Sequence, residues 1–203
     1  GKKPHPGVRD PAAALVDAAV AIIEAEGVDG LSLRKAARHV GVSHAAPAHH
    51  FGDLRGLLAA VAEQGFHILT AWMRAAEGAH PVDRPLDRFR AVGLAYVSFG
   101  HQQAPHLRVM FHSRLADKEG LDRLEQAARE SFEVLVEGIQ ACQAAEVVRE
   151  GDPRDLALVA WSAVHGLATL MADQQLAPKG FDPEPQTLGE LVTGLLADPA
   201  RLT

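Results

Sequence analysis

The chain has 203 residues, of which 47% are hydrophobic, 23% are charged and only 5% are aromatic, and its formal net charge is −6. This length suffices for one medium domain, or for a small module joined to a larger one, with a real hydrophobic core. The single cysteine, Cys142, excludes a disulfide framework and a cysteine metal site, which indicates a reducing cytoplasm. We also expect no signal peptide before the first helix.

Charge is unevenly distributed along the chain. Residues 1–58 carry seven basic and six acidic side chains, whereas residues 59–203 carry thirteen and twenty. A chain with a net negative charge is not expected to bind nucleic acid non-specifically over its whole surface. Any nucleic-acid binding must therefore be confined to one part of the chain. Residues 156–172 form a stretch of seventeen residues without a formal charge. A membrane-spanning helix needs about 20 apolar residues, so we expect a buried helix here and no membrane partner.

The first predicted element is a helix that follows a flexible arm at residues 1–9. Asp10 and Pro11 are typical of the cap and the first position of a helix, and Gly27 is typical of its end. Between them, the pattern predicts an amphipathic helix, because apolar residues recur at helical spacing. These residues are Leu15, Ala18, Ala19, Ile22 and Ile23.

The next stretch predicts two short helices joined by a tight turn. Ser32 is placed to cap the first helix, and Gly41 supplies the positive φ that ends it. We expect Ser43 to cap the second helix, which then carries Pro47 as its fourth residue. This arrangement is typical of helix-turn-helix DNA readers, in which the second helix enters the major groove.

The side chains on and around these two helices are mostly small or polar, which suits contact with DNA. Serine, histidine and basic side chains can donate to phosphates or base edges, and alanines allow close approach to thymine methyl groups. The expected partner is therefore double-stranded DNA with a near-palindromic operator. The predicted DNA-binding residues are Ser32, Arg34, Lys35, Arg38, Ser43, His44, Ala45, Ala46, Ala48, His49, His50 and Leu54.

The rest of the chain also predicts helices, separated by turns rich in glycine and proline. The expected helices cover residues 53–77, 86–103, 105–112, 120–146, 155–176 and 186–197. The fold class is thus all-α, with about nine to ten helices, because strand-like alternation is almost absent. A three-helix helix-turn-helix domain is expected at residues 10–64, and a helical ligand-binding and dimerisation domain at residues 65–203.

The last two long helices predict a homodimer. The helix at 155–176 is apolar on more than one face, so it needs a partner besides its own domain. The final helix carries a leucine-rich stripe, and pairing both helices with their copies gives a four-helix bundle about a two-fold axis. The predicted interface residues are Val159, Ala163, Leu167, Leu170, Leu188, Leu191, Val192 and Leu195.

Several large side chains of the body are candidates for an effector pocket. Ligand sites are apolar with a few polar groups, and His165 among apolar neighbours would be one such group. Each of these residues, taken alone, also fits ordinary core packing. The expected ligand is an apolar or amphipathic small molecule. The predicted pocket residues are Trp72, Met110, Phe111, Phe132, Trp161 and His165.

The histidines of the body do not form a metal motif. His101, His106 and His112 are five and six residues apart, so they do not share one helical face, and a pattern of the HExxH type is absent. The sequence also lacks a serine elbow, a glycine-rich phosphate loop and a paired-carboxylate motif. We therefore expect no enzyme activity, no cofactor and no metal.

The segment from residue 10 to about residue 64 resembles the tetracycline-repressor (TetR) family of transcription regulators. The remaining all-helical part fits the regulatory domain of that family, in which the carboxy-terminal helices form the dimer. Trp161, His165 and Gly166 also resemble the signature of its WHG-type regulatory domain. The residues that carry the main resemblance are Ala37, Gly41-Val42-Ser43, His50-Phe51 and Leu57-Leu58.

Two positions depart from the family pattern. Ala48 stands where the family usually has a tyrosine, and Leu54 stands where it usually has a lysine. In the family both positions tend to hold DNA phosphates. The resemblance therefore implies that this chain lacks two of those contacts.

Residues and resemblance together predict a cytoplasmic, homodimeric, ligand-responsive DNA-binding transcriptional regulator. We expect a repressor that a small-molecule effector releases from its operator by changing the separation of the two recognition helices. The alternative is a helical dimer with degenerate DNA contacts that acts as an interaction protein. Ala48 and Leu54 are the evidence for this alternative.

Overall fold

The computed structural model describes residues 10–115, 117, 120–181 and 184–196. Within this part of the chain every regular element is a helix, which confirms the predicted all-α class. The predicted arm at residues 1–9 and the predicted helix end at residue 197 lie outside the described residues. The side chain of Leu195, a predicted interface residue, also lies outside them.

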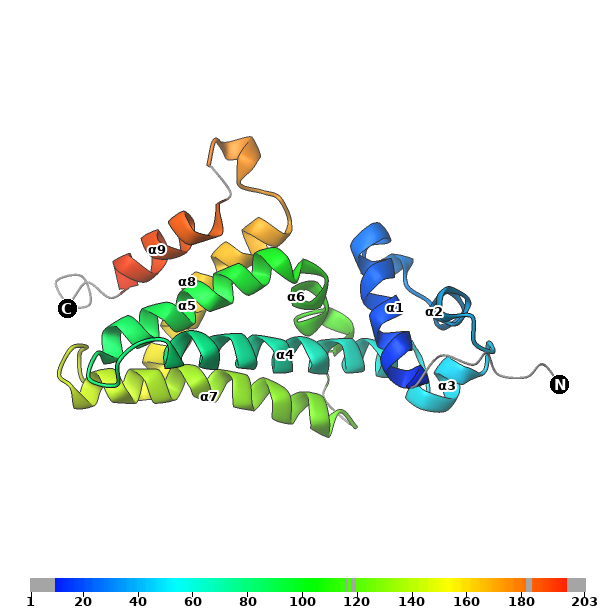
Figure 1. Ribbon diagram of the computed structural model, residues 1–203, viewed down its shortest axis with the longest axis horizontal. Helices are drawn as coiled ribbons and strands as arrows, with labels where there is room; N and C mark the ends of the chain where they lie inside the picture. Colours follow the sequence, from blue (N-terminus) through cyan, green and yellow to red (C-terminus); the bar gives the residue numbers. More distant parts are fainter. Residues whose placement is uncertain (1–9, 116, 118–119, 182–183, 197–203) are drawn as a thin grey trace. The chain divides into compact units, whose positions relative to one another are not determined.

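The helices follow the predicted chain order (Figure 1). The α-helices are α1 (Pro11–Glu26), α2 (Leu33–Val40), α3 (Ala46–Phe51), α4 (Leu54–Gly78), α5 (Pro85–Gln102), α6 (Ala104–Met110), α7 (Asp122–Ala144), α8 (Pro153–Ala172) and α9 (Pro185–Leu196). Short 3₁₀ turns occur at Val28–Gly30, Ser113–Leu115 and Ala177–Lys179.

The starts of helices α1 and α8 are set by the capping residues that precede them. The Asp10 carboxylate accepts hydrogen bonds from the backbone N–H of Ala12 at 2.9 Å and of Ala13 at 3.3 Å, as predicted for the start of α1. In α8, Asp152 accepts from the N–H of Arg154 at 2.8 Å. With Pro153 as the first helical residue, this cap starts α8 two residues before the predicted boundary.

The described residues fall into two compact units. The first comprises the chain up to Gly65 together with Pro105–Glu125, and the second comprises Phe66–Ala104 together with the chain from Gln126 onward. Helix α4 contributes its first turns to the first unit and the remainder to the second. In the first unit α1, α2 and α3 pack together, and in the second α5 packs against both α8 and α9.

Helix α8 combines a buried face with an exposed apolar face. Ala157, Ala160, Val164 and Ala168 are buried, because α5 and α9 cover this side of the helix. Among the described helices, α8 is the one long and apolar enough to cross a membrane by length and composition. This is weak evidence for a membrane span, because a core helix of a soluble protein passes the same test.

Candidate DNA-binding surface and effector cavity

Helices α2 and α3 are joined by the tight turn that the sequence predicts. The hydroxyl oxygen of Ser32 accepts a hydrogen bond from the N–H of Lys35 at 3.3 Å and so caps α2. At the other end, Gly41 has the left-handed conformation, with φ of 78°. The N–H groups of Gly41 and Val42 both donate to the carbonyl of Ala37 at 3.0 Å. The turn is therefore closed by backbone hydrogen bonds, and α3 follows it at a fixed angle.

The start of α3 differs from the prediction. Helix α3 begins at Ala46 rather than after Ser43, and no side chain caps it. The carbonyl of Ser43 instead accepts from the N–H of Ala46 at 3.0 Å, in a turn that precedes the helix. Pro47 is then the second helical residue, where an intrahelical N–H is not needed. The predictions of a Ser43 cap and of Pro47 at the fourth position were therefore wrong.

Most of the predicted DNA-binding side chains lie on the surface of this module. Lys35, Ala46 and Leu54 are half-buried, and the others are exposed: Ser32, Arg34, Arg38, Ser43, His44, Ala45, Ala48, His49 and His50. Because α3 starts late, Ser43, His44 and Ala45 belong to the turn and only Ala46, Ala48, His49 and His50 to the helix. The exposed histidines and small residues leave the surface of α3 open to a DNA groove.

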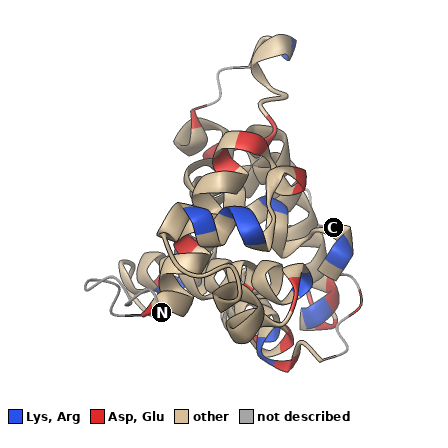
Figure 2. Ribbon diagram, turned by 90° about the vertical axis from the view of Figure 1, so that its right-hand side faces the viewer, with Lys and Arg blue, Asp and Glu red and all other residues tan. Residues whose placement is uncertain are grey.

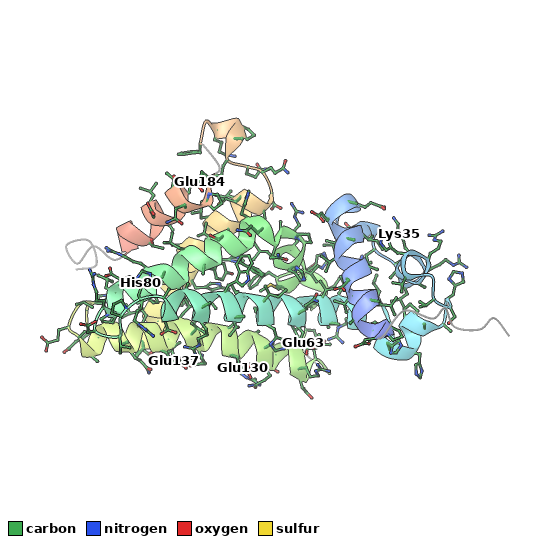
Figure 3. All side chains as sticks on the ribbon, viewed as in Figure 1. Lys35, Glu63, His80, Glu130, Glu137 and Glu184 are labelled. Atoms are coloured by element: carbon green, nitrogen blue, oxygen red, sulfur yellow. The ribbon has the colours of Figure 1, made fainter. Side chains whose placement is uncertain are left out.

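Lys35 has a structural partner that the sequence analysis missed. Its ammonium group pairs with the carboxylate of Glu26 at the end of α1 and also reaches the carbonyl of Gly30 at 3.4 Å. Figure 3 labels Lys35 on this module. By contrast, Arg34 and Arg38 are exposed and form no ion pair within the described residues. They are the better candidates for phosphate contacts.

The charge of the molecule is dispersed. Figure 2 shows basic and acidic segments of ribbon interspersed with long uncharged stretches, without one continuous basic stripe. DNA binding by this domain depends on local contacts more than on long-range electrostatic attraction. Long-range attraction of DNA requires charge of one sign over a wide face.

Three of the predicted pocket residues form one cluster in the second unit. The ring centroids of Phe132 and Trp161 are 6.1 Å apart, and those of Trp161 and His165 are 5.4 Å apart. Tyr96 of α5, which the sequence did not mark as a pocket residue, joins them. The indole N–H of Trp161 donates to the Tyr96 hydroxyl at 3.0 Å, and this hydroxyl lies 2.9 Å from Nδ1 of His165.

The direction of these hydrogen bonds follows from the donors available. The Tyr96 oxygen accepts from the indole, so its own proton is free to go to Nδ1 of His165. This arrangement needs a neutral imidazole, and burial lowers the pKa of His165. Burial also raises the pKa of Tyr96, which keeps the phenol protonated. The cluster is thus a neutral polar chain that runs from buried Tyr96 to half-buried Trp161 and His165.

The other predicted pocket residues do not join this cluster. Trp72 packs edge-to-face on Phe99, with ring centroids 6.0 Å apart. Met110 is buried and Phe111 is 40% exposed, and both belong to the first unit. Nearby in that unit, Nε2 of His106 donates to the Gln64 side-chain oxygen at 3.0 Å, while its buried Nδ1 has no partner among the described residues. Burial lowers the pKa of His106.

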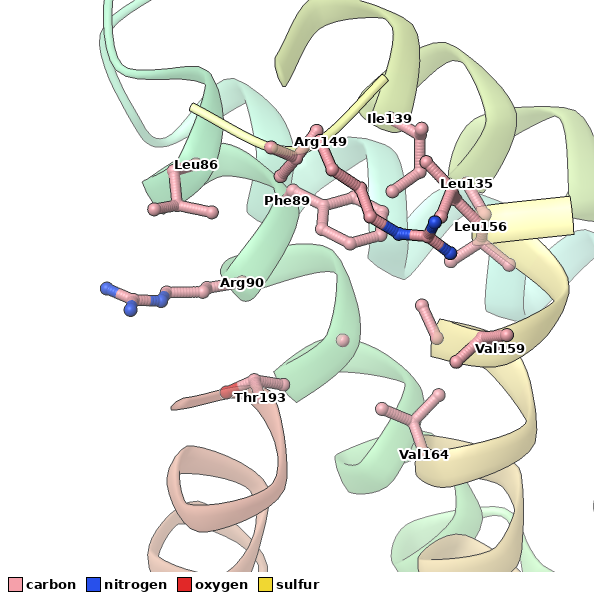
Figure 4. Close-up of a pocket in the computed structure, with 13 residues that line it drawn as sticks. Leu86, Phe89, Arg90, Leu135, Ile139, Arg149, Leu156, Val159, Val164 and Thr193 are labelled. Carbon is pink, nitrogen blue, oxygen red and sulfur yellow. The ribbon is translucent and has the colours of Figure 1, made fainter. Parts of the chain in front are cut away.

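A cavity lies elsewhere in the second unit, among α5, α7, α8 and α9 (Figure 4). Its volume is about 80 Å³, which is space for several water molecules or a short aliphatic chain. None of the six predicted pocket residues lines it, so the prediction did not locate this cavity. The lining residues are Leu86, Phe89, Arg90, Gly93, Leu135, Ile139, Val148, Arg149, Leu156, Val159, Ala160, Val164 and Thr193.

Two arginines supply the charged groups of a mostly apolar lining, to which Thr193 adds a hydroxyl group. Figure 4 shows the Arg149 side chain extended along the cavity toward Leu135 and Leu156, whereas the Arg90 guanidinium points away from them. Nε of Arg90 is nevertheless buried without a hydrogen-bond partner among the described residues. An apolar cavity with a cation at its side suits a molecule with an apolar chain and an anionic group.

The predicted dimer residues lie on a partly exposed apolar face of α8 and α9. Val159, Leu170 and Leu191 are 55%, 42% and 58% exposed, although they are large hydrophobic side chains. Leu158, which the prediction omitted, is 49% exposed. The remaining described interface residues are half-buried: Ala163, Leu167, Leu188 and Val192. Exposed apolar side chains gathered in this way are typical of an association surface.

Solved structures with the same fold cover nearly the whole chain. A protein of unknown function from Rhodococcus sp. RHA1 is 34% identical, with a TM-score of 0.79, over 97% of this chain and 100% of that one. FadR from Bacillus subtilis in complex with stearoyl-CoA is 15% identical (TM-score 0.75, 92% and 98% covered). AibR in complex with isovaleryl coenzyme A and operator DNA is 16% identical (TM-score 0.70, 94% and 100% covered).

The family is shown by two sequence matches. Residues 15–61 match the family described as "Bacterial regulatory proteins, tetR family", and residues 89–195 match "Tetracyclin repressor-like, C-terminal domain". No curated protein matches the sequence. The second match alone covers more than half of the chain, and the first covers α2, its turn and α3. The chain therefore belongs to the TetR family of DNA-binding transcriptional regulators, which are not enzymes.

Proposed function

We propose that this TetR-family regulator is a cytoplasmic, homodimeric repressor that leaves a near-palindromic operator when an amphipathic acyl compound enters the cavity of the second unit. The observation that carries this proposal is the apolar cavity with Arg149 extended along it. An acyl-CoA is the compound class that fits best. Its acyl chain suits the apolar lining, and its phosphates suit a guanidinium.

Related proteins support this chemical class. AibR binds isovaleryl coenzyme A and operator DNA, and FadR from Bacillus subtilis binds stearoyl-CoA. The size of the cavity favours a short chain, since its volume is about 80 Å³. We therefore propose a short-chain acyl-CoA for this regulator.

The dimer is supported by the exposed apolar face of α8 and α9. Val159, Leu170 and Leu191 would lose contact with water if the same face of a second copy covered them. Two copies would present two α3 helices, one for each half of an operator. A charged side chain in this face, such as Leu167→Asp, would then separate the subunits.

Helix α4 connects effector binding with DNA binding in this proposal. It runs without interruption from Leu54, directly after the helix-turn-helix, to Gly78 in the second unit. Effector binding would shift α4 and so change the separation of the two α3 helices. Such a shift requires that the effector binds the two conformations with unequal affinity. The WHG type of the regulatory domain stays a prediction, which rests on Trp161, His165 and Gly166.

The test of the effector site is calorimetric titration of the protein with acyl-CoAs of increasing chain length, with free coenzyme A as the control ligand. The variant Ala160→Leu adds bulk at a lining position of the cavity. We expect it to weaken acyl-CoA binding at least about tenfold, which corresponds to about 1.4 kcal/mol. Ala141→Leu, at an exposed position of α7, is the matched control and leaves binding unchanged.

A second variant tests the proposed contact to the anionic group. Arg149→Gln removes the charge beside the cavity, so it weakens acyl-CoA binding, and most strongly at low salt. Lys179→Gln, which removes an exposed charge from a 3₁₀ turn, does not. If Ala160→Leu melts as a folded protein and binds acyl-CoA like the wild type, the cavity is not the effector site.

A further inference from the structure

We propose that the cavity is completed by a second copy of this chain, so that effector binding and dimerisation strengthen each other. This proposal rests on the effector site and the dimer proposed above. The new element is that dimerisation regulates the affinity of the effector site. Neither the effector site alone nor the dimer alone implies this.

Val159 belongs to the cavity and to the exposed face at the same time. Its side chain lines the cavity, yet it is 55% exposed. Leu156 and Ala160 of the same helix also line the cavity, and neighbouring Leu158 is 49% exposed. On this side, the wall of the cavity is a single layer of α8 with water behind it. A wall without a second layer is free to move. Ordering it on effector binding costs conformational entropy, which weakens binding.

Helix α9 shows the same arrangement. Thr193 lines the cavity and is buried, whereas Leu191 is 58% exposed. A Cβ atom on Gly93 of α5 would lie 2.7 Å from the Thr193 side chain, so α5 and α9 meet closely at the cavity. The hydroxyl of Thr193 donates to the carbonyl of Gly189 within α9 and is turned away from solvent. Two walls of the cavity are therefore helices that also carry exposed apolar side chains, Leu158 and Val159 on α8 and Leu191 on α9.

A second copy of the chain is the occupant that this face fits. Residues 156–172 carry no formal charge, so two copies of α8 do not repel each other across a two-fold axis. Gly166 lies on the exposed side of α8 with open space around its Cβ direction, which allows a partner helix to come close. A strongly charged partner would meet no opposite charge in residues 156–172. Covering the face would hold Val159 from both sides and clamp α8 against α9.

The expected coupling can be stated as two measurable ratios. If the monomer binds one effector about tenfold more weakly than each subunit of the dimer does, reciprocity requires an effect on dimerisation. Saturating effector then tightens the dimer by the square of this factor, about a hundredfold, because each dimer holds two effectors.

The experiment compares a monomeric variant with the dimeric wild type, using isovaleryl-CoA as the ligand. The double variant Leu158→Glu, Leu191→Glu places charges on exposed positions that do not line the cavity. We expect it to be monomeric by sedimentation and to bind isovaleryl-CoA about tenfold more weakly than the wild type. Val82→Glu adds a charge at a position that is 84% exposed in the turn before α5, and it serves as the matched control.

A measurement on the wild type alone keeps the proposal testable if the double variant does not fold. Sedimentation over a dilution series, with and without saturating isovaleryl-CoA, should show the dimer dissociation constant fall about a hundredfold. If the monomeric variant binds isovaleryl-CoA as tightly as the wild type, or the ligand leaves the dimer constant unchanged, this proposal is overturned while the proposed function stands. A wild type that binds no acyl-CoA, or that is monomeric, overturns both.

Discussion

Tyr96 places a hydroxyl group in the core of the second unit, where its side chain is only 2% exposed. Its oxygen accepts from Trp161 and faces Nδ1 of His165, so one buried phenol connects α5 to two residues of α8. A buried polar group is costly unless it is hydrogen-bonded, and here both of its hydrogen-bonding functions are used. This chain of three side chains therefore helps to fix the register of α5 against α8.

Two histidines of the described chain, buried His106 and half-buried His165, predict how stability depends on pH. Burial lowers the pKa of His106 and of His165 from the ordinary value of 6.5, so the unfolded chain takes up these protons first as the pH falls. The free energy of unfolding should therefore be highest above about pH 6.5 and decrease as the pH falls below it. Denaturant titrations at several pH values measure this slope.

Variants at the two positions separate their contributions to this slope. His106→Gln and His165→Gln should each flatten the decrease in stability between neutral and acidic pH, because each variant removes one imidazole whose pKa is lowered in the folded state. His80→Gln, at an exposed position between α4 and α5, is the control. Slopes that are equal in the wild type and both variants would show that these two imidazoles are not responsible.

At the scale of elements, the capping serines give a matched pair of variants. Ser32 caps α2 through its hydroxyl, whereas the hydroxyl of Ser43 caps nothing in α3. Ser32→Ala should lower the free energy of unfolding by about 0.5–2 kcal/mol, and Ser43→Ala should leave it nearly unchanged. Chemical denaturation of both variants decides this, and equal losses would contradict the observed start of α3.

The DNA-binding elements can also be tested by restoring the residues that the family usually has. Ala48 is exposed on α3 and Leu54 is the first residue of α4. Leu54→Lys should tighten operator binding and steepen its log–log salt dependence by about one unit per subunit, because one more phosphate is neutralised. Ala48→Tyr should tighten binding with little change in salt dependence, since tyrosine is neutral.

Anisotropy titrations on operator DNA at several salt concentrations measure both effects. Val82→Lys adds the same charge outside the helix-turn-helix and should leave the salt dependence unchanged. If neither restoration changes affinity at any salt concentration, α3 does not contact DNA in the proposed way.

Helix identity was predictable here, whereas the start of α3 and the cavity were not. Asp10, Ser32 and Gly41 each carry a local signal that needs no tertiary information, and the structure confirms their roles. Ser43 and Pro47 gave conflicting signals for the start of α3. The proline prevailed, because its ring and missing N–H suit the first turn of a helix and no later one.

The cavity has no comparable signal in the sequence. Its lining is mostly aliphatic, and Leu135, Leu156 and Val164 have the spacing of ordinary core residues. Whether such residues pack closely or leave a cavity depends on how four helices pack together. The spacing of apolar residues within one helix does not predict this. Aromatic residues chosen by type, such as Trp72 and Trp161, instead proved to pack on neighbouring aromatic rings.

The whole molecule combines a helix-turn-helix, a mostly apolar cavity and an exposed apolar face in one chain. The family establishes that the first binds DNA. The cavity and the face share α8 and α9, so effector binding and association concern the same two helices. Helix α4 is the covalent link from this unit to the helix-turn-helix.

The central claim is that an acyl compound in the cavity controls DNA binding. The most direct test is the anisotropy of labelled DNA from the region beside the gene for this protein, titrated with the wild type and with Ala160→Leu, each with and without isovaleryl-CoA. We expect both proteins to bind this DNA, and we expect the ligand to release the wild type but not Ala160→Leu. Release of both proteins at the same ligand concentration, or of neither while calorimetry shows the wild type to be saturated, would contradict this claim.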